Sequence, residues 1–265
     1  MIMASGLDAF DVVVYRLAIS SPFLFLAFAL RRKGSLGVSP SVVTYLALGG
    51  FATFSAMISY YYAVSLIGVA LAAVLTYLAP VFTLISSPFL LGERVSSKKV
   101  ISASIVLIGC FLAVKAYSAS YLKLNELGIL IGIMCGLSYS LMTLTLKLLM
   151  KRGYEDMFKT VTFMLVFSTV FCLPFTALHP LKPVLDLEAL ALILVLAFPL
   201  TSLAYSLFVL GLSKAEASKS NIASSIEITT AVAVGILLLG EALEPIQILG
   251  ALLVIVGVSL LYLRD

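Results

Sequence analysis

The sequence predicts an all-α membrane protein, a polytopic helical bundle of about nine transmembrane helices in two inverted repeats. Three observations support this prediction: the composition, the lengths of the apolar runs, and a motif that occurs twice. Hydrophobic residues make up 62% of the 265 residues and charged residues 11%, and the mean hydropathy is +1.17. Soluble domains carry about 25% charged residues, so this composition excludes a water-soluble fold. The net charge of +4 is therefore no sign of a nucleic acid partner, and the expected surroundings are a lipid bilayer.

Nine apolar segments are long enough for a helix to cross the hydrocarbon core, which takes about 20 residues. They are Phe10–Leu30, Val42–Tyr62, Val69–Leu91, Val100–Tyr117, Leu127–Leu149, Phe158–Leu178, Ala189–Gly211, Ala217–Leu239 and Pro245–Leu263. A membrane β-barrel would show alternating segments of about 10 residues, whereas these runs are continuous. The start, MIMASGLDAFDVVVYRLAIS, has no basic residues before its apolar run and is not expected to be a signal peptide.

Lysine and arginine favour cytoplasmic loops, and here they divide unevenly between the two sides. One set of loops holds Lys115, Lys123 and Lys182, and Arg16 lies inside the first segment. The remaining 13 of the 17 lie in the alternate loops and at the C-terminus. We therefore expect a multi-pass protein of the cell membrane with its N-terminus outside and its C-terminus in the cytoplasm.

The motif Leu-Leu-Gly-Glu ends two of the segments, at residues 90–93 and 238–241. Gly92 and Gly240 differ by 148, and at the same offset Gly109 meets Gly257 and Thr76 meets Ser224. Five predicted crossings separate the two copies, and because five is odd, the copies should point in opposite directions. Inverted repeats of this kind are common in secondary transporters.

A family resemblance follows from Tyr60-Tyr61-Tyr62-Ala63, LAAVLTYLAPVF (71–82), the two LLGE motifs and LGALLVIVGV (249–258). Together they resemble the EamA-like branch of the drug/metabolite transporter superfamily over nearly the whole chain. The resemblance implies two inverted halves around a central cavity, here residues 1–117 with four helices and residues 118–265 with five.

Two departures from the family pattern stand out. The family has ten helices, and SGLDAFDVVVYRLAI is similar to its second one, so the first is expected to be absent through a late start codon or a shortened protein. The family often shows Glu-Pro in the paired helices, where this sequence has Ala79-Pro80 and Glu227-Ile228.

Glu227 is the strongest candidate for a substrate-binding residue. It falls near the middle of an apolar segment, where a charged group costs about 2.5–3.5 kcal/mol on insertion scales. Ser220, Ser224 and Glu227 are spaced 4 and 3 residues apart, which places them on one helix face. The alternative is a protonated glutamate that is hydrogen-bonded to another helix.

Thr76, Pro80 and Thr83 form a second candidate face, again at spacings of 4 and 3, with a kink expected at Pro80. A stripe of small residues that packs helices together is the alternative. Arg16 is a candidate for ligand contact, or else for snorkelling or a structural tie. Tyr77, Tyr139 and Tyr205 lie deep in their segments and are candidates for lining the cavity, with packing as the alternative.

The two Gly-Glu pairs have a structural interpretation. Glycine lets a helix end in a left-handed turn, and a glutamate near the start of the following helix is favoured by the helix dipole. Glu93 and Glu241 are therefore expected to act at helix junctions, with a direct role in transport as the alternative.

The function favoured is a secondary transporter that moves a small metabolite by alternating access, with export as the direction. The metabolite should be amino-acid-like, neutral, zwitterionic or amphiphilic. GxxxxGK[ST] is absent, so ATP is not expected to drive transport directly, whereas a proton on Glu227 could couple to it.

The alternatives are a non-transporting membrane subunit or sensor and, with less support, an intramembrane enzyme, since the single histidine, His179, lies at a helix end. No cofactor or metal is expected, and a homodimer stays open.

Overall fold

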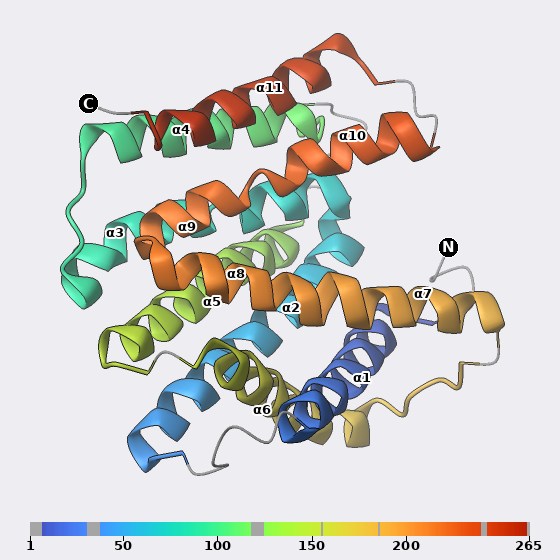
Figure 1. The fold of residues 1–265 in the computed structure, drawn as a ribbon. Coiled ribbons are helices and arrows are strands. Elements are labelled where there is room, and N and C mark those ends of the chain that lie inside the picture. Colours follow the sequence, from blue (N-terminus) through green and yellow to red (C-terminus); the bar gives the residue numbers. More distant parts are fainter. Residues whose placement is uncertain are drawn as a thin grey trace.

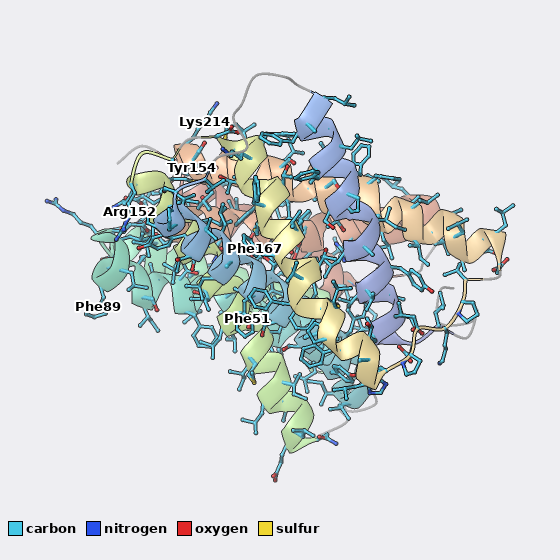
Figure 2. The ribbon with its side chains drawn as sticks, turned by 90° about the horizontal axis from the view of Figure 1, so that it is seen from below. Phe51, Phe89, Arg152, Tyr154, Phe167 and Lys214 are labelled. Carbon is cyan, nitrogen blue, oxygen red and sulfur yellow. The ribbon has the colours of Figure 1, made fainter. Side chains whose placement is uncertain are left out.

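The computed structural model describes residues 7–30, 38–117, 125–154, 156–184, 186–239 and 243–263. Within these ranges the chain is helical and contains no strand. Six described segments are apolar and at least 18 residues long, and the longest of them, Pro40–Leu91, has 52 residues. Large apolar side chains cover the outside of the bundle, as Figure 2 shows for Phe89, which is 86% exposed. Such a surface suits lipid rather than water, so the chain is a polytopic all-α membrane protein.

The first two helices are α1 (Ala9–Leu30) and α2 (Pro40–Thr76), and α2 is interrupted at Gly68. Gly68 has φ 80° and ψ 164°, a conformation that glycine adopts without steric cost. Contacts with α5 (Glu126–Lys151) show that the chain reverses there. The contacting pairs are Gly49 with Leu146 and Ile67 with Gly128 before the turn, and Thr76 with Cys135 and Thr83 with Ser140 after it. Residues 40–67 therefore run antiparallel to α5 and residues 69–91 run parallel to it, as two separate crossings.

The remaining helices follow with short connections. They are α3 (Ala79–Leu91), α4 (Ser97–Ala113), α6 (Met157–Leu178), α7 (Leu187–Ala197), the π-helix η3 (Phe198–Leu203), α8 (Ala204–Lys214), α9 (Ala217–Ser224), α10 (Glu227–Leu239) and α11 (Pro245–Leu260). The segments α7, η3 and α8 form one continuous span, whereas α9 and α10 form one span broken at Ser225–Ile226. Within the described ranges, these helices make the nine apolar segments that the sequence predicts.

Two predicted helices differ in detail from the structure. The segments 69–91 and 217–239 are each broken in the middle rather than continuous. Pro80 does not kink a helix, because the break comes earlier, at Tyr77–Leu78, and Pro80 occupies the first turn of α3. Proline is tolerated in a first turn because the N–H that it lacks would have no partner within the helix.

The helix boundaries repeat at the offset of 148 that the motif shows. α1 and α6 begin at residues 9 and 157, α3 and α10 at 79 and 227, and α4 and α11 at 97 and 245. Both breaks also coincide, since residues 77 and 78 correspond to 225 and 226. At the second LLGE motif, Gly240 and Glu241 lie outside the described residues.

Two of these equivalent pairs, α4 with α11 and α1 with α6, pack against each other at opposite ends of the view in Figure 1. In the first pair a Cβ added to Gly109 would lie 2.9 Å from the Val254 side chain, and one added to Gly257 would lie 2.8 Å from Val106. Because 106 corresponds to 254 and 109 to 257, the two contacts are the same contact made twice. In the second pair Thr169 donates a hydrogen bond to its counterpart Ser21 at 2.9 Å. Such reciprocal contacts are the signature of a twofold relation.

Candidate functional site

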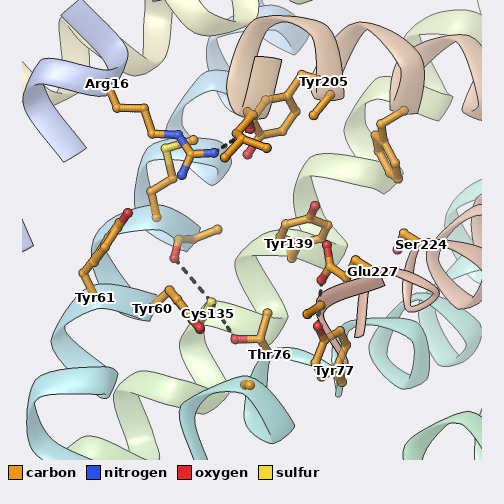
Figure 3. A pocket seen from close by; sticks show the side chains of 17 residues that line it. Arg16, Tyr60, Tyr61, Thr76, Tyr77, Cys135, Tyr139, Tyr205, Ser224 and Glu227 are labelled. Carbon is orange, nitrogen blue, oxygen red and sulfur yellow. Dashed lines mark hydrogen bonds between the residues drawn. The ribbon is translucent and has the colours of Figure 1, made fainter. Parts of the chain in front are cut away.

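A cavity of about 580 Å³ lies inside the bundle, and Figure 3 shows the side chains that line it. It is bounded by α1, both parts of α2, α5, η3, α8, and the broken span of α9 and α10. Seven of the ten predicted site residues line it: Arg16, Thr76, Tyr77, Tyr139, Tyr205, Ser224 and Glu227. These residues, which come from α1, the end of α2, α5, α8, α9 and α10, thus meet in one place.

The two helix breaks bring polar groups to the cavity. Thr76 ends α2 and Ser224 ends α9, while Glu227 begins α10. A helix start has unpaired backbone N–H groups and a positive dipole end, so a carboxylate is favoured there. The Tyr77 hydroxyl donates to Glu227 Oε1 at 2.9 Å, and Glu227 is an exposed residue that lines the cavity. The start of α10 and the hydrogen bond from Tyr77 therefore hold the Glu227 side chain at the cavity, where a ligand can reach it.

Arg16 is held at another wall of the cavity by the π-helix. Its Nη2 donates to the Leu200 carbonyl at 2.8 Å, and its Nε donates to Thr201 Oγ1. The π-helix shifts the backbone register and leaves carbonyl oxygens available; Ser20 of α1 donates to one of them, that of Ala197, at 2.8 Å. Arg16 thus ties α1 to η3 and also faces the cavity, so the structural tie and the cavity-lining role coexist.

The cavity also contains residues that the sequence did not single out as site residues. Tyr60 and Tyr61, which the sequence analysis used only for the family resemblance, line it, and so do Met57, Cys135 and Phe208. The offset of the repeat could have predicted some of these residues as counterparts of the predicted residue Tyr205 and its neighbours. Ala56, Met57 and Tyr60 correspond to Ala204, Tyr205 and Phe208 at the offset of 148, and all six line the cavity.

Three predicted residues, Ser220, Pro80 and Thr83, do not line the cavity. The spacing that put Ser220 on the face of Glu227 assumes one continuous helix, but the chain breaks at Ser225–Ile226. Ser220 instead donates to the Glu216 carbonyl at 3.0 Å within α9. The break at Tyr77–Leu78 likewise separates Thr76 from Pro80 and Thr83, both of which are buried beyond the cavity.

Thr83 belongs to a buried polar network between α3, α5 and α9. Its hydroxyl donates to Ser140 Oγ at 2.8 Å and accepts from Asn221 Nδ2 at 2.5 Å. Asn221 in turn accepts from Thr143 Oγ1 at 2.9 Å. The network separates the cavity from the end of the molecule where α3 stops, which we name the Glu93 end; the opposite end, where α2 turns at Gly68, is the Gly68 end.

Glu93 closes that end of the bundle. Its carboxylate accepts from the Ala217 N–H at 2.6 Å and from the N–H and hydroxyl of Ser218 at 3.2 and 2.7 Å. Glu93 therefore acts at a helix start, but at that of α9; the following helix, α4, is capped by Ser96. The expectation that Glu93 would serve its own helix junction was wrong, because the chain packs α3 against α9 in the other half.

Ion pairing strengthens the same end. Lys99 Nζ lies 2.7 Å from Glu216 Oε2, next to the start of α9. Partial burial raises the pKa of Glu216, but the hydrogen bond and charge of Lys99 outweigh it and leave this pKa below its ordinary value. Among the described residues, no group of three His, Cys, Asp or Glu side chains could hold a metal ion.

Comparison with known proteins agrees with this architecture. The model of the EamA-like transporter family matches residues 1–115 and 126–263. A solved crystal structure superposes with a TM-score of 0.81 over 96% of this chain and 88% of that chain, at 18% sequence identity, which indicates a shared fold.

Two curated relatives carry the word transporter or exporter in their names. An uncharacterised transporter of Archaeoglobus fulgidus is 30% identical over 256 residues, which is 96% of this chain and 86% of that protein. The pseudopaline exporter CntI of Pseudomonas aeruginosa is 28% identical over 117 residues, or 44% of this chain, and the match spans only 40% of the exporter. With a family match over both halves and a full-length relative, the chain is a membrane transporter and belongs to the EamA-like transporter family.

Proposed function

We propose that this protein is a secondary transporter of a small zwitterionic metabolite of amino-acid type, which it exports by alternating access. The observation that carries the proposal is the presence of Arg16 and Glu227 in one cavity. They are the two charged side chains among the described lining residues, and their charges are opposite. Because unpaired charges at membrane depth are costly, a ligand with one positive and one negative group would be matched by both.

The rest of the cavity suits such a ligand. Its volume of about 580 Å³ falls in the range of small-molecule sites, about 300–1,000 Å³. Tyr60, Tyr61, Tyr77, Tyr139, Tyr205 and Phe208 supply aromatic surface for an apolar side chain. The amino group is assigned to Glu227 and the carboxylate to Arg16, whose guanidinium already donates to two protein oxygens and keeps further N–H groups.

Alternating access rests on the two repeats, residues 1–117 and 118–265. The common offset of the helix boundaries and the reciprocal contacts of α4 with α11 and of Ser21 with Thr169 support a twofold axis through the cavity. Because α4 runs antiparallel to α11, this axis lies in the plane of the membrane. The distribution of Lys and Arg favours the Glu93 end as cytoplasmic, so the cavity would face outward in this state.

Ligand-dependent stabilisation of the purified protein tests the substrate class. We expect zwitterionic amino acids with apolar side chains to raise the thermal unfolding temperature, and the matching amines and carboxylic acids to fail, because each leaves one charge unmatched. Glu227→Gln should abolish the shift. Glu126→Gln, which changes an exposed acid in the first turn of α5, should retain it.

Transport in proteoliposomes completes the test. The stabilising amino acid should cross the bilayer with wild type and with Glu126→Gln, and at least about tenfold more slowly with Glu227→Gln, the effect of losing about 1.4 kcal/mol of binding. If Glu227 carries a coupling proton, the remaining flux should also lose its pH dependence. Equal transport by Glu227→Gln and wild type at every pH would refute the role of Glu227.

A further inference from the structure

The two ends of the cavity differ sharply although the repeats make them equivalent. At the Glu93 end, Thr83 of α3 and Asn221 of α9 are 0% and 1% exposed, and they are hydrogen-bonded to each other. Their counterparts at the offset of 148 are Ala231 of α10 and Ala73 of α2. Both alanines line the cavity, and Ala231 is exposed. One pair of equivalent helices is therefore closed while the other is open.

A second equivalent pair shows the same contrast. Tyr77, beside one helix break, lines the cavity, whereas its counterpart Ser225, beside the other break, is 1% exposed. The Ser225 hydroxyl is buried without a hydrogen-bond partner in the structure. A buried hydroxyl without a partner costs about 1–3 kcal/mol, so this side chain is better accommodated in a state where water reaches it.

We propose that Thr83, Asn221 and Ser225 line the substrate path when the cavity opens at the Glu93 end, and that Ala73 and Ala231 then close the Gly68 end. This inference rests on the proposed alternating access, and it assigns to that mechanism a second set of path residues. In the second state each residue of one repeat takes the surroundings that its counterpart has now. The helix pair α3–α9 separates, and the end of α2 meets α10.

The chemistry of the two sets gives each a distinct role. Thr83, Asn221 and Ser225 present hydroxyl and amide groups without a formal charge. A zwitterion leaving Glu227 and Arg16 would therefore find hydrogen-bonding partners along the path before it reaches the charged groups Glu93, Lys99 and Glu216 at the end of the molecule. The closure at the Gly68 end uses two methyl side chains, which allow helices to approach closely.

Disulfide trapping tests the closure. In the full chain with Cys110, Cys135 and Cys172 replaced by serine, the double variant Ala73→Cys with Ala231→Cys should cross-link under mild oxidation in membrane vesicles. Cross-linking requires Cα atoms about 4.4–6.8 Å apart, which the proposed state supplies. The control pair, Val74→Cys with Ala231→Cys, moves one thiol by one residue around the helix and should stay reduced. The pair Thr83→Cys with Asn221→Cys should cross-link in the state seen here.

Thiol labelling tests the opening. With the disulfide between Ala73→Cys and Ala231→Cys formed, Ser225→Cys should react with a charged methanethiosulfonate at least about tenfold faster than with that pair reduced. The reason is that trapping fully populates a state that is otherwise a minor one. As a second variant, Ala231→Phe, whose ring blocks closure, should slow the labelling of a cysteine at 225.

The outcomes separate this inference from the proposed function, because the thiol readout needs no substrate. Cross-linking of Ala73→Cys with Ala231→Cys no faster than the control pair, or labelling at 225 unchanged by it, would overturn the inference even if transport is observed. Normal trapping with no amino acid transported would leave the inference standing and refute the substrate class.

Discussion

The carboxylate of Glu93 joins the end of α3 to the start of α9, where it binds Ala217, 124 residues away in the sequence. Gly92 has φ 63°, so the chain turns out of α3 in a left-handed conformation and directs the next side chain toward α9. Three donors at the start of α9 then bind the carboxylate. A negative charge at a helix start is stabilised by the helix dipole as well as by these bonds, which makes Glu93 a major contributor to closure at its end.

Glu93→Gln should therefore destabilise the closed end by about 1–2 kcal/mol, because the amide group presents a donor where the backbone N–H groups need an acceptor. We expect a lower thermal unfolding temperature and faster thiol labelling of a cysteine at position 221. Glu126→Gln is again the matched control, as another acid in the first turn of a helix. If neither unfolding nor labelling changes, the bonds to α9 contribute nothing to closure.

Single residues also show where sequence patterns lose their value. Glu227 was predicted from its charge and its depth in an apolar segment, whereas Ser224 and Thr76 were predicted from helical spacing, and the structure brings all three to the cavity. Ser220 and Thr83 were predicted from helical spacing, which holds only in an unbroken helix. The breaks depend on tertiary packing around residues 77 and 225, so no local spacing rule could have located them.

At the scale of helices, the contact between α4 and α11 depends on glycine. A Cβ at Gly250 would lie 2.4 Å from the Ala113 nitrogen and 2.6 Å from the Gly109 carbonyl oxygen. Backbone atoms cannot move aside as a flexible side chain can, so the two helices would have to separate. The pair lies on the proposed twofold axis, where it holds the repeats together while the broken helices exchange positions.

Gly250→Ala is predicted to destabilise the protein by about 1–3 kcal/mol through overpacking. Thermal unfolding in detergent measures the effect. Gly211→Ala in α8 is the control: an added Cβ there meets nothing within 4 Å, and alanine favours a helix by about 0.5–1 kcal/mol over glycine. Equal unfolding temperatures for the two variants would show that the α4–α11 contact is loose.

Helices were the most predictable level of this structure. Long apolar runs identify a crossing without help from tertiary structure, and the reversal at Gly68 falls between two predicted segments. The π-helix η3 was not foreseen, because Phe198–Leu203 has the same apolar composition as its neighbours. Arg16 and Ser20 of α1 donate to carbonyl oxygens of this segment, those of Leu200 and Ala197. Contacts between residues so far apart in the sequence leave no pattern in the local sequence.

For the whole molecule, the offset of 148 was visible in a few residues and is present in nearly every helix boundary. Thin sequence identity conceals the relation because membrane helices tolerate exchange among apolar residues, whereas glycines at close contacts and breaks at the cavity are constrained. α5 has no counterpart at this offset among the described helices. The repeat therefore predicts the cavity walls that the other helices form, but not the wall that α5 contributes through Cys135 and Tyr139.

The inverted arrangement itself is open to a direct test with single cysteines in the cysteine-free background. Val95 and Leu243 are equivalent at the offset of 148 and lie in the connections before α4 and α11. If the repeats are inverted, an impermeant thiol reagent should label Val95→Cys from one side of the membrane and Leu243→Cys from the other.

Two further positions calibrate the sides in the same vesicles. The helix directions place the exposed residue Lys214 with Val95 and the exposed residue Leu187 with Leu243. A cysteine at 214 should therefore follow the labelling of position 95, and one at 187 that of position 243. Labelling of positions 95 and 243 from the same compartment would remove the in-plane twofold axis. Equivalent helices could then no longer exchange surroundings, and a cavity open at the Gly68 end would have no symmetric state that opens at the Glu93 end.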